Sequence, residues 1–260
     1  MSLLGKSALV TGSTSGIGLG IAQGLAREGA NIMLNGFGDP AAIEAIRVEI
    51  AGFGVKVEYD AADMTKPDQI AAIVAKTEAA FGSLDILVNN AGIQHVAPIE
   101  SFPADRWEMI IALNLSSSFY TMQAAIPGMK ARKWGRIVNI ASAHGLVGSE
   151  QKSGYVAAKH GLLGLTKVAA LELASFGITA NAICPGWVLT PLVEKQLNAR
   201  AEKEGRPVAE LTQDFLSEKQ AIAEFTTPDQ IAAMVVFLCS DNARTITGAP
   251  FSIDGGWVAR

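Results

Sequence analysis

The 260-residue sequence predicts an α/β protein, a single-domain doubly wound parallel sheet with a small helical lid. Short apolar runs of four or five residues, with little polar alternation, are typical of strands buried on both faces. Longer segments with helical periodicity separate these runs, and repeated strand–helix–strand units imply right-handed crossovers. No internal repeat, low-complexity linker or break in composition divides the chain, which favours one domain over residues 1–260.

The apolar runs and helical patterns give the expected elements in order. The predicted strands are Ser7–Val10, Asn31–Leu34, Val55–Tyr59, Asp85–Val88, Arg136–Ile140, Thr179–Ile183 and Ala249–Ile253. The predicted helices are Gly18–Glu28, Pro40–Ala51, Pro67–Phe81, Ala104–Met129, Tyr155–Ala174 and Pro228–Ser240. Asp39-Pro40 and Thr227-Pro228 place a proline in a first helical turn, which is a helix start signal.

A charged helical stretch over Leu189–Ile222 departs from this alternation because it has no strand partner. It follows a strand end, where ligands bind in doubly wound sheets. An ordinary pair of surface helices would give the same pattern. The position after the strand favours a lid over the site.

The composition excludes several classes of protein. Apolar residues make up 49% and charged residues 18%, so the chain can bury a core large enough to exclude disorder. With 21 basic and 25 acidic residues the net charge is −4, which gives no electrostatic support for a nucleic-acid partner. No uninterrupted apolar run approaches the roughly 20 residues that span a bilayer. We therefore expect no membrane partner.

The remaining composition points to a cytoplasmic, soluble enzyme. The N-terminus runs directly into the first predicted strand and leaves no room for a signal peptide. Cys184 and Cys239 lie far apart in apolar surroundings, as buried reduced thiols do. The three histidines show no metal-ligand spacing, so no metal site is predicted. The low charge suggests surface that is buried against other subunits.

A glycine-rich loop connects the first strand to the first helix. Gly12, Gly16 and Gly18 give the spacing Gly-x-x-x-Gly-x-Gly. Glycines let the backbone approach a pyrophosphate, and the helix N-terminus presents free N–H groups and a positive dipole. With 26 glycines in the chain, the spacing alone is a moderate signal, and the strand–loop–helix setting strengthens it as a dinucleotide site.

At this point the chain resembles the short-chain dehydrogenase/reductase family. The resemblance rests on the glycine loop, Asn89–Gly92, Asn114, Ser142 and the pair Tyr155 and Lys159, and it covers nearly the whole chain. It implies a Rossmann fold, a nicotinamide dinucleotide and the catalytic set Asn114, Ser142, Tyr155 and Lys159. The expected cofactor contacts are Gly12, Thr14, Ser15, Gly16, Ile17, Phe37, Asp63, Asn90, Ala91, Gly92, Tyr155, Lys159, Pro185, Gly186, Val188 and Thr190.

The resemblance also distributes these contacts along the dinucleotide. It implies that Asp63 meets the adenine edge and Asn90 the adenosine-side ribose, with Pro185-Gly186, Val188 and Thr190 beside the nicotinamide. A 2′-phosphate needs a nearby Arg or Lys, and neither the glycine loop nor residues 35–39 contains one, so NAD is favoured over NADP. The family's usual acid at the end of the second strand is absent. Asp39 could replace it or could cap the next helix.

Tyr155 and Lys159 are four residues apart and share one helix face. The Lys159 ammonium should lower the pKa of Tyr155 from about 10, so that Tyr155 can exchange a proton with the alcohol oxygen during hydride transfer. Ser142 would hydrogen-bond that oxygen, and Lys159 would also hold the nicotinamide ribose. The resemblance assigns Asn114 a water-mediated proton route to Lys159.

Four potential hydrogen-bond donors cluster in the sequence around these positions, namely Gln94, His144, Lys152 and Gln196, and together they suit a small carboxylate. Trp187 and Trp257 could form a wall at the apolar end of the substrate, although Trp257 could equally contact another subunit. The segments that contain these residues resemble family members that oxidise (R)-3-hydroxybutyrate reversibly to acetoacetate with NAD. That resemblance implies a homotetramer. The expected substrate contacts are Gln94, Ser142, His144, Lys152, Tyr155, Trp187, Gln196 and Trp257.

Two alternatives share parts of this pattern. An NADP-linked 3-oxoacyl thioester reductase would use the same catalytic set, but His144 and Lys152 argue against it because a thioester has no carboxylate there. A non-catalytic dinucleotide-sensing module would not need Ser142, Tyr155 and Lys159 together.

Overall fold

The computed structural model describes residues 2–259, apart from the side chains of Leu192 and Gln196. Its strands form one seven-stranded sheet in the order β3-β2-β1-β4-β5-β6-β7, and every neighbouring pair is parallel. This order confirms the doubly wound architecture. The strands are β1 (Ser7–Val10), β2 (Asn31–Asn35), β3 (Val57–Asp60), β4 (Ile86–Asn89), β5 (Gly135–Ile140), β6 (Ile178–Pro185) and β7 (Pro250–Ile253).

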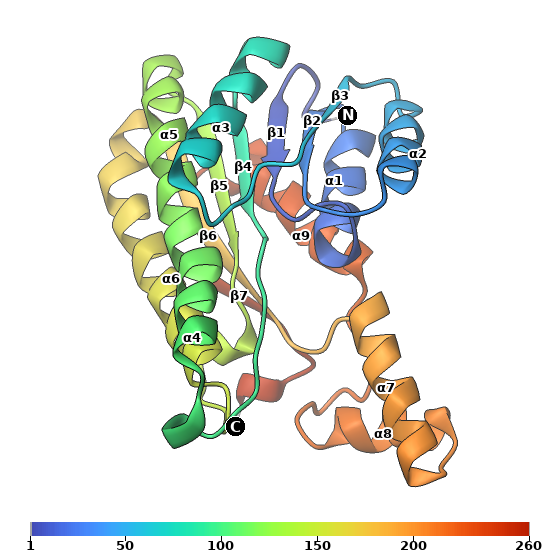
Figure 1. Ribbon diagram of the computed structural model, residues 1–260. Helices are drawn as coiled ribbons and strands as arrows, with labels where there is room; N and C mark the ends of the chain where they lie inside the picture. The colour runs from blue at the N-terminus through green and yellow to red at the C-terminus, as the bar shows by residue number, and fades with distance from the viewer. Residues whose placement is uncertain (1, 260) are drawn as a thin grey trace.

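Helices cover both faces of the sheet, with α1, α2 and α9 on one face and α3 to α6 on the other (Figure 1). The helices are α1 (Gly16–Arg27), α2 (Pro40–Ala51), α3 (Pro67–Phe81), α4 (Ala104–Ile111), α5 (Ser117–Arg132), α6 (Ser153–Leu173), α7 (Pro191–Glu204), α8 (Val208–Ser217) and α9 (Pro228–Cys239). The predicted bounds of α2 and α3 are confirmed. The predicted bounds of β1 are confirmed too, and most of the remaining predicted ends are wrong by one to three residues.

Successive residues of each central strand enter opposite cores. In β1, Ala8 and Val10 pack with the helices α1 and α9, whereas Leu9 packs with α3 and α5. The same alternation in β4 places Leu87 opposite Ile86 and Val88. Because side chains alternate between the two faces of a strand, burial on both faces requires an uninterrupted apolar run. This explains the strand pattern of the sequence.

The predicted single helix Ala104–Met129 is interrupted. A π-helical turn over Ala112–Ser116 separates α4 from α5, and Asn114 is buried within this turn. One extra residue in a helical turn leaves the overall apolar pattern nearly unchanged, so periodicity did not reveal it. Such turns are frequent at functional sites. The stretch Ala104–Arg132 is long and apolar enough to cross a membrane, but its buried face belongs to the core of the domain.

The charged stretch after β6 forms the helices α7 and α8, which project from the body of the protein (Figure 1). A short parallel bridge closes its base, because Leu189 N donates to Thr226 O and Thr226 N donates to Trp187 O, both at 3.0 Å. The Arg206 guanidinium ties the turn between the helices to Asp214 at 2.8 Å. We use the term lid for residues 189–222.

Candidate active site

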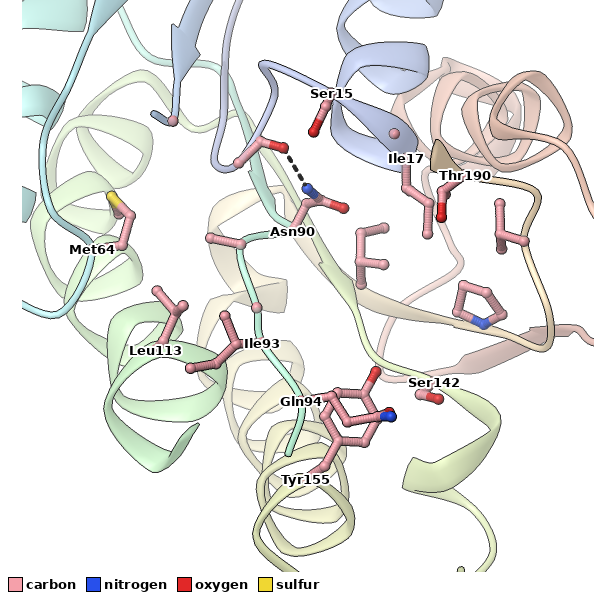
Figure 2. A pocket seen from close by; sticks show the side chains of 18 of the residues that line it. Ser15, Ile17, Met64, Asn90, Ile93, Gln94, Leu113, Ser142, Tyr155 and Thr190 are labelled. Atoms are coloured by element: carbon pink, nitrogen blue, oxygen red, sulfur yellow. Dashed lines mark hydrogen bonds between the residues drawn. The ribbon is translucent and has the colours of Figure 1, made fainter. Parts of the chain in front are cut away.

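The glycine loop, the ends of β4 and β5, helix α6 and the segment after β6 line one cavity of about 980 Å³. It opens at the carboxyl ends of the strands, where ligands bind in this architecture. Several labelled side chains project into it (Figure 2). The residues predicted for the site that line it are Gly12, Thr14, Ser15, Gly16, Ile17, Phe37, Asp63, Asn90, Ala91, Gly92, Gln94, Ser142, Tyr155, Lys159, Pro185, Gly186, Trp187, Val188 and Thr190.

The glycine loop is shaped for close approach of a ligand. Gly12 and Gly16 have φ of +62° and +55°, a region that favours glycine. A Cβ on Gly18 would collide with the Gly12 carbonyl and with the Asn90 amide. The Asn90 amide donates to Thr11 O and Gly12 O at 2.9 and 3.0 Å, which fixes the loop to β4 (Figure 2).

The first turn of α1 is free to meet an anion. Ser15, the N-cap, makes no side-chain hydrogen bond to the helix. The N–H groups of a first helical turn have no partner within the helix, and the helix dipole favours negative charge there. This cradle fits the pyrophosphate of a dinucleotide.

Polar side chains in and around the end of β2 form hydrogen bonds with neighbouring backbone groups. The Asn35 amide donates to Asp60 O and Ala62 O at 3.1 and 2.9 Å, and Thr14 Oγ1 donates to Phe37 O at 3.0 Å. The Asp39 carboxylate accepts from Ala42 N at 2.9 Å, so Asp39 caps α2. Of the two interpretations of Asp39, the structure supports capping.

Asp63 also lines this cavity. Its Oδ1 accepts from the backbone N–H and the hydroxyl of Thr65 at 2.9 and 2.8 Å. The backbone bond from Thr65 is the main cause that lowers the pKa of Asp63. The carboxylate is therefore held in its charged form and in one orientation, available to a donor on a ligand.

Ser142, Tyr155 and Lys159 meet at the inner end of the cavity. Ser142 follows β5, and the other two residues lie on α6. Figure 2 labels Tyr155 and Ser142 in this part of the cavity, and the two side chains share a hydrogen bond. Lys159 Nζ donates to Ile140 O at 2.7 Å and lies 5.6 Å from the centroid of the Tyr155 ring.

The electrostatics of this pair differ from the expectation. Burial raises the pKa of Tyr155, and its hydrogen bond with Ser142 opposes the rise. Burial lowers the pKa of Lys159 to about 8. The predicted lowering of the Tyr155 pKa by Lys159 is therefore wrong for this arrangement. Desolvation disfavours the charged form of both groups, and the Lys159 ammonium hydrogen-bonds to the Ile140 carbonyl instead.

Asn114 forms hydrogen bonds with the segment that follows β4. Its Oδ1 accepts from Ile93 N and its Nδ2 donates to Ile93 O, both at 2.9 Å. Among the residues described, Asn114 is not part of the cavity lining. The two bonds instead fix the backbone of Ile93, which precedes the cavity-lining Gln94.

The substrate residues predicted near Tyr155 form one aromatic group. The His144 ring lies 6.0 Å from the Tyr155 ring and 5.0 Å from Trp257, centroid to centroid. Trp257 lies 5.4 Å from Trp187, and Trp187 lies 4.2 Å from Phe215 of α8. We call Trp187, Phe215 and Trp257 the aromatic wall. Sequence reasoning missed Phe215, whose only signal was an apolar position on a lid helix.

Positive charge gathers beside this wall. Lys152 Nζ lies 5.5 Å from the centroid of the Trp187 ring. Burial, and then the charge of Lys219, lower the pKa of Lys152. Lys219 lines a second cavity of about 540 Å³ with Gly148, Ser149 and Glu150. Sequence reasoning missed Lys219 because only folding brings it beside Lys152. The side chain of Gln196, the remaining predicted substrate contact, lies outside the described residues.

His144 should make the stability of the protein depend on pH. Burial, followed by the charges of Lys152 and Lys219, lowers its pKa from 6.5 to about 4. Between these values the unfolded chain binds a proton that the folded protein excludes, so the free energy of unfolding falls as the pH drops from 6.5 towards 4. His144→Phe should remove about 2–3 kcal/mol of this loss between pH 7 and pH 4.5. Urea unfolding of the wild type and of His144→Phe at pH 7 and pH 4.5 measures this difference. An equal fall in the free energy of unfolding in both proteins would contradict the prediction.

Comparison with known proteins identifies the family. The protein-family model described as Enoyl-(Acyl carrier protein) reductase matches residues 12–258 of the chain. A D-beta-hydroxybutyrate dehydrogenase of Cupriavidus necator is 59% identical, over 99% of this chain and 100% of its own. The chain belongs to the short-chain dehydrogenase/reductase family. A D-beta-hydroxybutyrate dehydrogenase of Rhizobium meliloti is 54% identical, over 98% of this chain and 99% of that protein.

A solved structure supports the fold of this short-chain dehydrogenase/reductase. A candidate gluconate dehydrogenase from Agrobacterium tumefaciens matches with a TM-score of 0.90 at 32% identity, over 100% of this chain and 98% of that one. Membership of the family gives the protein a nicotinamide dinucleotide cofactor. The glycine cradle and the open first turn of α1 fit its pyrophosphate.

Proposed function

We propose that the protein is an NAD-dependent 3-hydroxybutyrate dehydrogenase, which reversibly oxidises (R)-3-hydroxybutyrate to acetoacetate. The observation that carries the proposal is the placement of two donors near the catalytic tyrosine: the His144 ring lies 6.0 Å from the Tyr155 ring, and Lys152 Nζ lies 5.5 Å from the Trp187 ring of the aromatic wall. A carboxylate needs charge-assisted partners when it leaves water. The names of the relatives from Cupriavidus necator and Rhizobium meliloti agree with this substrate.

In the proposed reaction, Tyr155 takes the proton of the substrate hydroxyl and returns it during reduction. Ser142 donates a hydrogen bond to the same oxygen as charge develops on it. The bound nicotinamide supplies the chemistry of hydride transfer. Lys159 holds the ribose hydroxyls next to it, and Asn114 fixes the backbone of Ile93 and provides the proton route towards Lys159.

Gln94, His144, Lys152 and Gln196 are proposed to hold the substrate carboxylate. Trp187 and Trp257 enclose the short carbon chain. His144 is neutral at physiological pH, because its pKa lies at about 4. It therefore contributes a single N–H donor, and Lys152 contributes the charge. A substrate with one carboxylate and a short apolar chain matches both the polar donors and the two tryptophans.

NAD is the proposed form of the cofactor. Among the described residues that line the cavity, Lys159 is the one Lys or Arg, and it lies at the catalytic end. A 2′-phosphate would meet no guanidinium or ammonium group there, whereas such a phosphate requires one. At the adenosine end we assign the adenine edge to Asp63 and the ribose to Asn90. At the other end we assign the nicotinamide to Pro185, Gly186, Val188 and Thr190.

The proposed function is tested by the absorbance of NADH formed from a panel of substrates. The panel holds (R)- and (S)-3-hydroxybutyrate, other short hydroxy acids and 3-hydroxyacyl thioesters, each with NAD and with NADP. We expect the highest kcat/KM for (R)-3-hydroxybutyrate with NAD. Preference for a thioester with NADP would instead support the thioester reductase. Dinucleotide binding without turnover of any substrate would support a sensing module.

Exposed apolar side chains on α5 and α6 support a homotetramer. Leu171 and Val168 of α6 are 83% and 51% exposed, and Phe119 of α5 is 45% exposed. Large apolar groups clustered on a surface often mark a subunit interface. We propose that these faces meet in the tetramer, and that the enzyme is cytoplasmic.

We also propose that the lid closes on substrate and not on NAD alone. The body of the domain contains the glycine loop and Lys159, so NAD can bind without the lid, whereas a carboxylate held by Lys152 and by Gln196 would bridge body and lid. Only then does closure add contacts. Amide exchange across 192–222 should stay fast with NAD and slow when acetoacetate is added. Equal protection with NAD alone would contradict closure by substrate.

A further inference from the structure

Gln220, a buried polar side chain after α8, has no part in the reaction as proposed. It is only 2% exposed. Its Oε1 accepts from Trp187 N at 2.9 Å, and its Nε2 donates to Ile222 O and Glu224 O at 3.1 and 2.9 Å. An amide with its acceptor and both donors engaged is fixed in one orientation.

The C-terminal turn packs against the same amide. Ala221 N and Ile222 N donate to Gly255 O at 2.8 and 2.9 Å. A Cβ on Gly255 would lie 2.8 Å from Gln220 Nε2, and one on Gly186 would lie 3.0 Å from Gln220 Oε1. Three segments of the chain, two of them distant in sequence from Gln220, therefore meet at its amide.

Two of these segments contain the tryptophans of the aromatic wall. Gln220 holds the backbone of Trp187 directly. Trp257 follows the Gly255 turn, which the Asp254 carboxylate fixes by accepting from Gly256 N and Val258 N at 3.0 Å each. The third segment is the root of the lid, where the chain leaves α8.

We propose that Gln220 is a positioning residue that sets the place of Trp187 relative to Trp257 and couples this spacing to the root of the lid. This inference rests on the proposed function, because it assigns Gln220 to the binding of the carboxylate substrate. The hydrogen bonds of the Gln220 amide join it to Trp187, Ile222 and Glu224, and none of them reaches the hydroxyl of Tyr155 or the glycine loop. It therefore acts chiefly on the affinity for the substrate and leaves proton transfer unchanged.

Gln220→Met keeps the length of the side chain and removes its three hydrogen bonds. The N–H of Trp187 and the carbonyls of Ile222 and Glu224 are then left without this partner, and buried polar groups that lose a partner rearrange or pay desolvation. We expect the KM for 3-hydroxybutyrate to rise about tenfold or more, with kcat within about threefold of the wild type. The Kd for NADH should change less than the KM, because the hydrogen bonds of Gln220 reach the nicotinamide residues Gly186 and Val188 only through the backbone of Trp187.

A second variant displaces the amide without removing it. Gly255→Ala should push on Gln220 and raise the KM in the same way. Gly82→Ala is the matched control, because Gly82 also has a positive φ, +86° against +60°, but a Cβ there meets nothing within 4 Å. The control should lower Tm through backbone strain and leave the KM unchanged. If Gln220→Met does not fold, this pair decides the proposal.

Amide exchange at Trp187 gives a readout that needs no substrate. Gln220→Met should speed exchange at Trp187 at least tenfold and leave exchange within β6 unchanged. Wild-type KM and wild-type Trp187 protection in the variant would overturn the proposal, as would a fall in kcat at constant KM. If the wild-type protein does not oxidise 3-hydroxybutyrate, the proposed function fails, and Trp187 exchange alone then decides whether Gln220 positions the wall.

Discussion

Tyr155→Phe should lower kcat for 3-hydroxybutyrate oxidation by about 100- to 10,000-fold, the range that a general acid–base group contributes. The substitution removes the hydroxyl that exchanges the proton and preserves the ring, which packs 6.0 Å from His144. Initial rates of NADH formation measure the loss. The Kd for NADH, from fluorescence titration, should stay within about twofold, because the rest of the dinucleotide cradle is untouched.

The matched control for this variant is Tyr120→Phe. Tyr120 lies on α5 and packs against Phe119 with ring centroids 5.4 Å apart, away from the cavity lining. Its variant should keep wild-type kcat and KM. Near-normal turnover by Tyr155→Phe would remove Tyr155 from the proton-transfer role. A parallel loss of NADH binding would show that the phenol supports the cofactor instead.

The sequence predicted the parts of the site that depend on local structure. The glycine loop was recognisable because a strand, a tight turn and a helix follow one another within a few residues. Tyr155 and Lys159 could be placed on one face because helical spacing fixes their relation. Each central strand could be read as apolar on both faces, as the opposite placement of Leu9 and Val10 confirms.

The features that depend on tertiary structure could not be predicted. The π-helical turn at Asn114 hardly alters the apolar pattern of the helix, and the sign of the Tyr155 pKa shift depends on burial, which no local pattern gives. Lys219 and Gln220 reach the site from the turn after α8, more than 60 residues after Tyr155. The bridge between Val188 and Thr226 and the hydrogen bond from Trp187 N to Gln220 Oε1 bring that region back to the cavity.

Lys152→Met should lower kcat/KM for 3-hydroxybutyrate by about 10- to 150-fold, chiefly through KM. A charge-assisted hydrogen bond contributes roughly 1.5–3 kcal/mol, and methionine keeps the apolar stem beside Trp187. The methyl ester of 3-hydroxybutyrate has no carboxylate, so its kcat/KM should change little. Comparing acid and ester by NADH absorbance isolates the charge. Lys56→Met, at an exposed lysine just before β3, is the control.

Lys219 also affects how far kcat/KM falls when Lys152 is substituted. Because its charge lowers the pKa of both Lys152 and His144, it is close enough to attract the same carboxylate. We expect Lys219→Met alone to cost less than Lys152→Met, since Lys219 is exposed and water screens its charge. After Lys152 is removed, Lys219 can take over part of its attraction for the carboxylate, so the double variant should lose more than the sum of the single free-energy changes. Strict additivity would mean that the two lysines act on the substrate independently, and wild-type kinetics in Lys152→Met would place Lys152 outside the carboxylate site.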